Sequence, residues 1–263
     1  MRTPPNADIA APEFPPGTEW LNAAFLRMDK QIGRAVLLEF WDYARINSLR
    51  TLPYMQAWHE RYGELGLRVI GVHSPGYSFG RERTGVERAV ARLGIRHPVA
   101  LDPDFEIWQT YGNKGWPGRY LFDRRGWLRL IHYGEGEYLE TELAIQELLL
   151  EIDDDLSLPE PLAPLRPEDA PGVELEPQTA DIVLPDGSDR LELVRDWSDG
   201  PDYIEALDAG AGAAVKSFRA GAAYAVLSGS VEPGLYESDG SVSADSPGLR
   251  LHGFQFTPLP PES

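Results

Sequence analysis

Two polar side chains that could take part in binding or catalysis, Arg45 and Ser48, stand three residues apart in the stretch WDYARINSLRTLPY, residues 41–54. Arg45 carries a permanent charge, and beside the free N–H groups of a helix N-terminus it could capture a carboxylate or phosphate. Ser48 would need a nearby base to act as a nucleophile, but no histidine lies in this stretch. The plainer alternatives are a solvated surface arginine and a serine that caps the helix.

The flanking residues predict a β-α-β unit around this junction. Ala35–Trp41 is a short apolar run rich in β-formers and predicts a buried strand. Asn47 to Tyr62 has apolar residues at helical spacing, and Leu67–Val72 predicts a second buried strand. The two strands should be parallel and joined by a right-handed crossover.

The remaining elements divide the chain into three parts. Residues 1–152 predict an α/β domain with a mixed central sheet flanked by helices. Residues 153–178 contain six prolines and many acids, which indicates an extended linker. Residues 179–263 show short apolar runs about ten residues apart, typical of a small all-β sandwich. The further elements expected in the first part are helices at Arg81–Leu93, Asp104–Tyr111 and Tyr138–Ile152, and strands at Pro98–Leu101, Arg119–Phe122 and Trp127–Tyr133.

The composition excludes several classes of function. There is no cysteine among the 263 residues, so this chain can form no disulfide, thiolate nucleophile or cysteine-ligated metal site. The five histidines are scattered without zinc-type spacing. We therefore expect no cofactor and no metal site.

Charge and hydropathy bear on partners and location. The net charge is −18, of which residues 151–263 carry −17. An acidic half argues against nucleic acid, which needs neutralising lysines and arginines. No stretch approaches the roughly 20 apolar residues that span a bilayer, so membrane insertion is not expected. The N-terminal residues lack the features of a secretory signal, which indicates a cytoplasmic protein.

Three separated segments carry a specific family resemblance. FWDYARINSLRTLPYMQAWHERY, LRVIGVHSPGYSF and IRHPVALDPDFEIWQTYGNKGWPGRYLFDRRG occur in the order found in thioredoxin-like proteins of the TlpA/DipZ type. The resemblance covers roughly residues 12–150 and implies a thioredoxin-like fold. Members of this family are thiol-disulfide oxidoreductases with a Cys-x-x-Cys pair. Arg45 and Ser48 stand at those two positions, and neither side chain can perform thiol-disulfide exchange.

The resemblance also implies a polypeptide-binding groove. Trp116-Pro117 matches the family's cis-proline position, where backbone pairs with bound polypeptide like an added strand. Trp41 and Trp116 would flank this groove, although ordinary packing is the alternative for both. The predicted binding surface is therefore Trp41, Arg45, Ser48, Trp116 and Pro117, in a redox-inactive protein that binds a polypeptide or protein partner.

Glu39 matches the position of the buried acid that assists proton transfer in thioredoxins. A buried carboxylate should be paired or have a raised pKa, and Arg45 or Arg50 could be its partner. Cysteine-independent catalysis around Glu39, Arg45 and Ser48 is an alternative function to polypeptide binding.

The C-terminal part resembles, more loosely, the small jelly-roll module of DipZ-type proteins. The supporting stretches are FRAGAAYAVLS, GLYES and PGLRLHGFQFTP. That resemblance implies carbohydrate binding as an alternative function. The candidate stacking residues are Trp197, Tyr203, Tyr224 and Tyr236, for which core packing is the competing interpretation.

Overall fold

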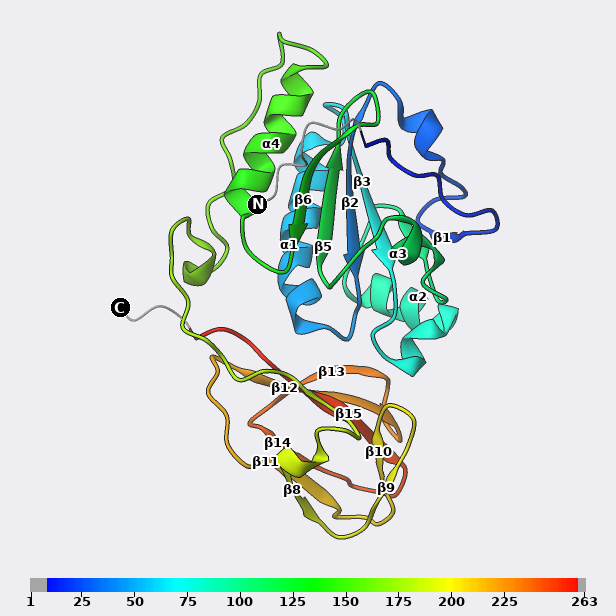
Figure 1. Cartoon of the computed structure of the whole chain (residues 1–263), viewed down its shortest axis with the longest axis vertical. Helices are drawn as coiled ribbons and strands as arrows, with labels where there is room; N and C mark the ends of the chain where they lie inside the picture. Colours follow the sequence, from blue (N-terminus) through cyan, green and yellow to red (C-terminus); the bar gives the residue numbers. More distant parts are fainter. Residues whose placement is uncertain (1–8, 260–263) are drawn as a thin grey trace. The chain divides into compact units, whose positions relative to one another are not determined.

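The computed structural model describes residues 9–259 and divides the chain into two compact units. The first unit comprises residues up to 42 together with 47–75 and 81–171. The second unit comprises residues from 172 onward and two short segments, Tyr43–Ile46 and Gly76–Gly80. Each unit has its own sheets, as Figure 1 shows.

A six-stranded mixed sheet forms the centre of the first unit, with strand order β1-β4-β3-β2-β5-β6 (Figure 1). The β2–β3 and β3–β4 pairs are parallel and the other three pairs are antiparallel. This confirms the predicted β-α-β unit, whereas the edge strand β1 was not predicted. The strands are β1 (Glu19–Leu21), β2 (Ala35–Trp41), β3 (Leu67–His73), β4 (Val99–Leu101), β5 (Gly118–Phe122) and β6 (Leu128–Tyr133).

In the part of the chain that the structure describes, the α-helices are α1 (Ile46–Tyr62), α2 (Arg83–Arg92), α3 (Glu106–Thr110) and α4 (Tyr138–Leu150), and all but Ile46 belong to the first unit. Helices α1 and α4 share one buried cluster with Ala35 and Leu37 of β2. The alternate residues of β2 face a second cluster, to which α3 contributes. Because strand side chains alternate, Glu39 points toward the α1/α4 face. Among the described residues, no helix combines the length and apolar character needed to cross a bilayer.

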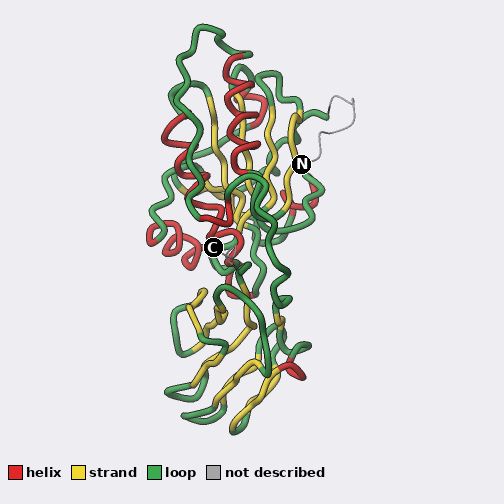
Figure 2. Tube along the Cα trace, turned by 90° about the vertical axis from the view of Figure 1, so that its left-hand side faces the viewer, coloured by secondary structure: helices red, strands yellow, loops and turns green. Residues whose placement is uncertain are grey.

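The second unit consists of antiparallel sheets, drawn in yellow in Figure 2. One sheet has the order β13-β12-β15-β10-β9, with β7 also pairing β15, and the other has the order β14-β11-β8. Their inner faces enclose one apolar cluster that includes Phe254 and Phe256. The apolar runs that predicted strands here lie at 181–184, 191–194, 203–207, 213–218, 223–227, 234–237 and 249–256, so β9 and β14 were not predicted. The strands are β7 (Ile182–Val183), β8 (Leu191–Val194), β9 (Trp197–Asp199), β10 (Ile204–Ala206), β11 (Gly212–Val215), β12 (Ala223–Gly229), β13 (Gly234–Ser238), β14 (Ser241–Ser243) and β15 (Leu249–Phe256).

Candidate functional site

Ser48 and Trp41 lie in the interior. Ser48 is 0% exposed in the first turn of α1, and its hydroxyl accepts a hydrogen bond of 3.2 Å from the Asp42 N–H. Trp41 lies edge-on to the His73 ring, and a Cβ added at Gly71 would stand 2.9 Å from its indole nitrogen. Because both side chains are buried, neither offers a surface to which a ligand could bind.

Arg45 belongs to the second unit and is half-buried. Its guanidinium carbon lies 5.0 Å from the centre of the Tyr77 ring, a cation–π distance. Burial raises the pKa of the Asp181 carboxyl, and the charge of Arg45 opposes that rise. The side chain is therefore held by aromatic and acidic neighbours and is not a freely solvated surface arginine.

A glutamine that the sequence did not single out holds the Tyr43–Ile46 segment within the second unit. The Gln255 amide donates to the Ala44 carbonyl at 2.7 Å and to the Tyr77 hydroxyl at 3.0 Å. Its Oε1 accepts from the Ile46 N–H at 2.7 Å. That N–H opens helix α1 and has no acceptor inside the helix. No local pattern predicts this role, because Gln255 and Ala44 are 211 residues apart.

The Trp116–Pro117 peptide bond is cis, as predicted. Trp116 is half-exposed, and its indole N–H donates to the Ser74 carbonyl at 2.9 Å. Trp108 lies 4.4 Å and Phe105 6.3 Å from its ring centre. Phe105, Trp108 and Trp116, hereafter the aromatic cluster, are all half-exposed, whereas Pro117 is buried.

Asp102 fixes the backbone beside this aromatic cluster. Its carboxylate accepts from the N–H groups of Ile107 and Trp108 at 2.9 and 3.0 Å, and from the Ser74 hydroxyl at 2.7 Å. It therefore supplies acceptors to two N–H groups in the first turn of α3, which have none inside the helix. Burial raises the pKa of Asp102, and the three hydrogen bonds oppose the rise.

The buried acid Glu39 faces a different arginine from those predicted. In the β2–β5 register Glu39 lies opposite Arg119, whose charge is the one that lowers the Glu39 pKa. Arg50 instead forms ion pairs of 2.6 Å with Glu135 and 2.9 Å with Glu168. The effect of burial is larger than that of the Arg119 charge, and it raises the pKa of Glu39 to about 8. Expecting Arg50 as partner was wrong because the strand register brings Arg119 there.

Arg119 is 0% exposed and is held by polar and aromatic neighbours from the loop before α4 and from α4 itself. It donates to the Thr141 hydroxyl at 3.1 Å and to the Gly136 carbonyl. Its guanidinium carbon lies 5.1 Å from the Tyr138 ring centre. These contacts compensate part of the cost of burying the cation, while desolvation lowers its pKa.

Ser228, His252 and Asp202 lie together as a polar group in the second unit that the sequence did not reveal. The Ser228 hydroxyl lies 2.7 Å from His252 Nε2, and Asp202 Oδ1 lies 3.6 Å from His252 Nδ1. The order resembles a serine–histidine–acid array. However, Ser228 is 4% exposed, and the Tyr77 and Phe79 rings lie edge-on to the imidazole. A substrate therefore has no access to this hydroxyl, and the group is structural.

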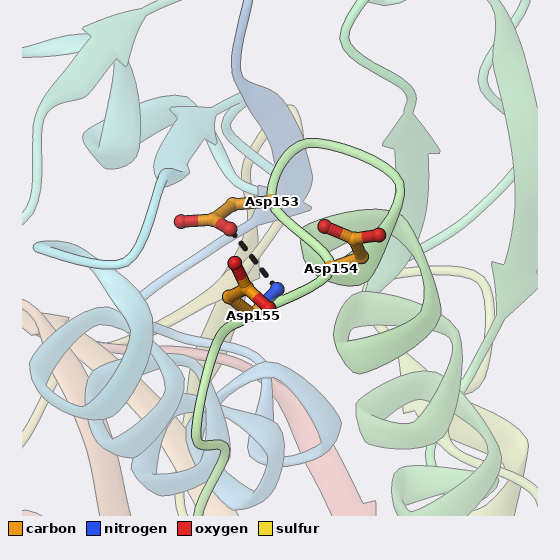
Figure 3. A group of neighbouring side chains, drawn as sticks. All are labelled: Asp153, Asp154 and Asp155. Carbon is orange, nitrogen blue, oxygen red and sulfur yellow. Dashed lines mark hydrogen bonds between the residues drawn. The ribbon is translucent and has the colours of Figure 1, made fainter.

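One set of acids among the described residues has its oxygens close enough for a cation. Asp153, Asp154 and Asp155 follow α4 and are all exposed (Figure 3). The Asp153 carboxylate already accepts from the Asp155 N–H at 3.1 Å. We assign no metal function to these acids.

The four aromatic residues considered for carbohydrate stacking do not form one platform. Trp197 packs against the core and donates to the Gly212 carbonyl. Tyr203 lies 4.6 Å below the Arg250 guanidinium. On β12 and β13, Tyr224 pairs with Glu237 and Tyr236 with Ala225, which places the two tyrosines on opposite faces.

Comparison with known proteins supports the fold. No protein-family model matches the chain. It is 37% identical over 172 residues to Protein DipZ of Mycobacterium tuberculosis, a match that covers 64% of this chain and 25% of DipZ. It is 26% identical over 108 residues to the thiol-disulfide oxidoreductase ResA of Geobacillus thermodenitrificans, covering 41% of this chain and 59% of ResA.

A solved structure of a thioredoxin-like superfamily protein superimposes with a TM-score of 0.50 at 22% identity, covering 58% of this chain and 100% of that protein. The predicted thioredoxin-like fold is confirmed. The chain spans about a quarter of the length of DipZ.

Proposed function

We propose that this cysteine-free homologue of DipZ and ResA, with its thioredoxin-like fold, is redox-inactive and acts by binding a polypeptide partner. The observation that carries the proposal is the identity of two residues. By the family resemblance, Arg45 and Ser48 occupy the positions of the reactive cysteines, and the chain has no cysteine at any position. Thiol-disulfide exchange needs a thiolate that attacks a disulfide, and neither a guanidinium nor an alcohol can replace it.

Trp116 is the residue of the predicted surface in the first unit that a partner can reach, and its neighbours Phe105 and Trp108, which the sequence did not single out, extend that surface. Trp116 and its neighbours Phe105 and Trp108 are half-exposed. Of the other predicted residues, Trp41, Ser48 and Pro117 are buried, and Arg45 is half-buried against Tyr77 in the second unit. Tryptophan side chains provide a large contact area and an N–H group, which makes them frequent anchors at protein interfaces. We therefore place the polypeptide on the aromatic cluster.

Reduction of insulin by dithiothreitol tests the redox part of the proposal. The unaltered chain should leave the rate at its uncatalysed level. The double variant Arg45→Cys with Ser48→Cys restores the dithiol and should form an internal disulfide, detected by mass spectrometry after alkylation. Turnover by the unaltered chain would disprove redox inactivity.

Fluorescence anisotropy with a library of labelled extended peptides tests the binding part. At least one peptide class should saturate, and Trp116→Ala should weaken its binding at least tenfold. Trp127→Ala is the matched control, because Trp127 is a half-exposed tryptophan in the turn between β5 and β6. If every peptide fails to saturate, or if both variants lose binding equally, the aromatic cluster is not the binding surface.

A further inference from the structure

The proline-rich segment that follows α4 is bonded to the first unit through its backbone. On the α4 side, the Gln146 amide donates to the Pro159 carbonyl at 2.8 Å. The Glu142 carboxylate accepts from the Leu162 N–H at 2.9 Å. Glu142 is itself buried and also accepts from the Tyr62 hydroxyl at 2.6 Å. A buried carboxylate is thus committed to one backbone N–H of this segment.

Helix α1 also contacts this segment through hydrogen bonds. The Tyr54 hydroxyl accepts from the Leu165 N–H at 2.8 Å. The Arg166 guanidinium donates to the Arg50 carbonyl at 2.9 Å. Arg61 donates to the Glu160 carbonyl. Side chains of α1 and α4 therefore bond main-chain groups of residues 159–165, and Arg166 of the segment bonds the main chain of α1.

Apolar side chains of the segment fill the space between the helices. Leu156, Leu158 and Leu162 pack against the cluster shared by α1 and α4. The floor includes the rings of Tyr54 and Tyr138, stacked at 3.8 Å with an interplanar angle of 7°. The surface formed by α1 and α4 is therefore lined by tyrosine rings with polar hydroxyl groups, and leucines of the segment pack against it.

The far end of the segment is fixed by charge. Asp169 accepts from the Tyr54 hydroxyl at 2.8 Å and pairs with Arg166 at 3.0 Å. Glu168 pairs with Arg50 at 2.9 Å. These pairs are largely withdrawn from solvent, so they orient the chain more firmly than exposed pairs do.

We propose that the α1/α4 face is a recognition groove for an extended proline- and leucine-rich polypeptide, and that residues 156–169 are its resident ligand. A proline-rich chain has few internal hydrogen bonds and loses little entropy when it is held extended. Recognition by aromatic grooves and by side chains that bond the ligand's backbone is the known way to bind such chains. A simple spacer needs none of these contacts. The groove shares no residue with the aromatic cluster.

A peptide in trans tests whether the segment is a true ligand. The full chain with Leu158→Asp and Leu162→Asp keeps every residue of α1 and α4, but the packing of residues 156–169 against these helices is weakened. A labelled peptide of residues 154–171 should bind this variant saturably. It should bind the unaltered chain at least tenfold more weakly, because a tethered ligand acts at a concentration on the order of millimolar. The same peptide with both aspartates is the control and should not bind.

A folded variant that does not bind the peptide overturns the proposal, as does equal binding of the control peptide. Hydrogen exchange on the intact chain gives a second measurement that needs no weakened segment. The Leu162 and Leu165 amides should be protected, Tyr54→Phe should expose Leu165 preferentially, and Glu142→Met should expose Leu162. Unprotected amides in the unaltered chain would refute the groove.

Discussion

Replacing Glu39 with glutamine should remove a specific pH dependence from the stability of the first unit. Glu39 is buried between the sheet and helices α1 and α4, and among residues 9–259 its Oε2 finds no hydrogen-bond donor. Burial raises its pKa from 4.5 to about 8 despite the charge of Arg119. The side chain is therefore protonated in the folded protein at neutral pH, a form that glutamine imitates in shape and charge.

The sign of the effect follows from proton linkage. Between about pH 4.5 and pH 8 the folded protein holds a proton on Glu39 that the unfolded chain has released. A group whose pKa is raised by folding contributes stability that is full below the unfolded pKa and is lost as the pH rises toward the folded pKa. Each pKa unit corresponds to about 1.4 kcal/mol, so the loss across the window is on the order of 5 kcal/mol.

The assay is urea unfolding followed by tryptophan fluorescence at pH 5, 6, 7, 8 and 9. Six of the seven tryptophans lie in the first unit, so the signal reports mainly on that unit. The unfolding free energy of the Glu39→Gln variant, relative to the unaltered chain, should rise steadily up to about pH 8 and then level off. Glu64→Gln is the control, because Glu64 is exposed.

Parallel pH profiles for the Glu39→Gln variant and the unaltered chain would refute this reasoning. They would mean that Glu39 is ionised in the folded protein and that Arg119 compensates its burial completely.

Three further substitutions test contacts described above. Arg119→Met should lower the unfolding free energy by about 2–4 kcal/mol in the same urea assay, because it removes a buried donor to Thr141 and an aromatic contact; a loss below 1 kcal/mol would contradict this. Asp102→Ala should lower the unfolding free energy by about 2 kcal/mol and change the tryptophan fluorescence of the aromatic cluster, because two N–H groups in the first turn of α3 lose their acceptor. An unchanged spectrum would argue against this positioning role of Asp102. Gln255→Leu should accelerate hydrogen exchange at the Ile46 amide and destabilise the second unit by about 2–4 kcal/mol, whereas unchanged exchange would show that the amide bond contributes little.

Local pattern was sufficient for the long elements of the first unit. The apolar run at Ala35–Trp41 and the helical spacing up to Tyr62 correspond to β2 and α1 within a residue. Both signals are strong because buried strands and amphipathic helices impose their period on many consecutive residues. The three-residue strand β1 (Glu19–Leu21) carries no such period, and its pairing with β4 is set by the tertiary structure.

The site was less predictable because its contacts join distant parts of the chain. The opposition of Glu39 and Arg119 depends on the β2–β5 register, and the role of Gln255 depends on a segment 211 residues away. Composition indicated an extended backbone after Asp153, but it could not indicate the partners of that backbone. Glu142 lies 20 residues before its partner Leu162, whereas Tyr54 lies 111 residues before Leu165. Residue type limits which bonds a side chain can make, while topology selects the partner.

The inclusion of Tyr43–Ile46 and Gly76–Gly80 in the second unit makes that unit discontinuous along the chain. No single proteolytic cut can release it whole, and a fragment starting at residue 172 would lack the backbone that Gln255 binds. Gln255 and Ala44 are 211 residues apart, and contacts between such distant residues form slowly. The second unit should therefore fold after the first. Exchange of this module between genes would accordingly require that both short segments travel with it.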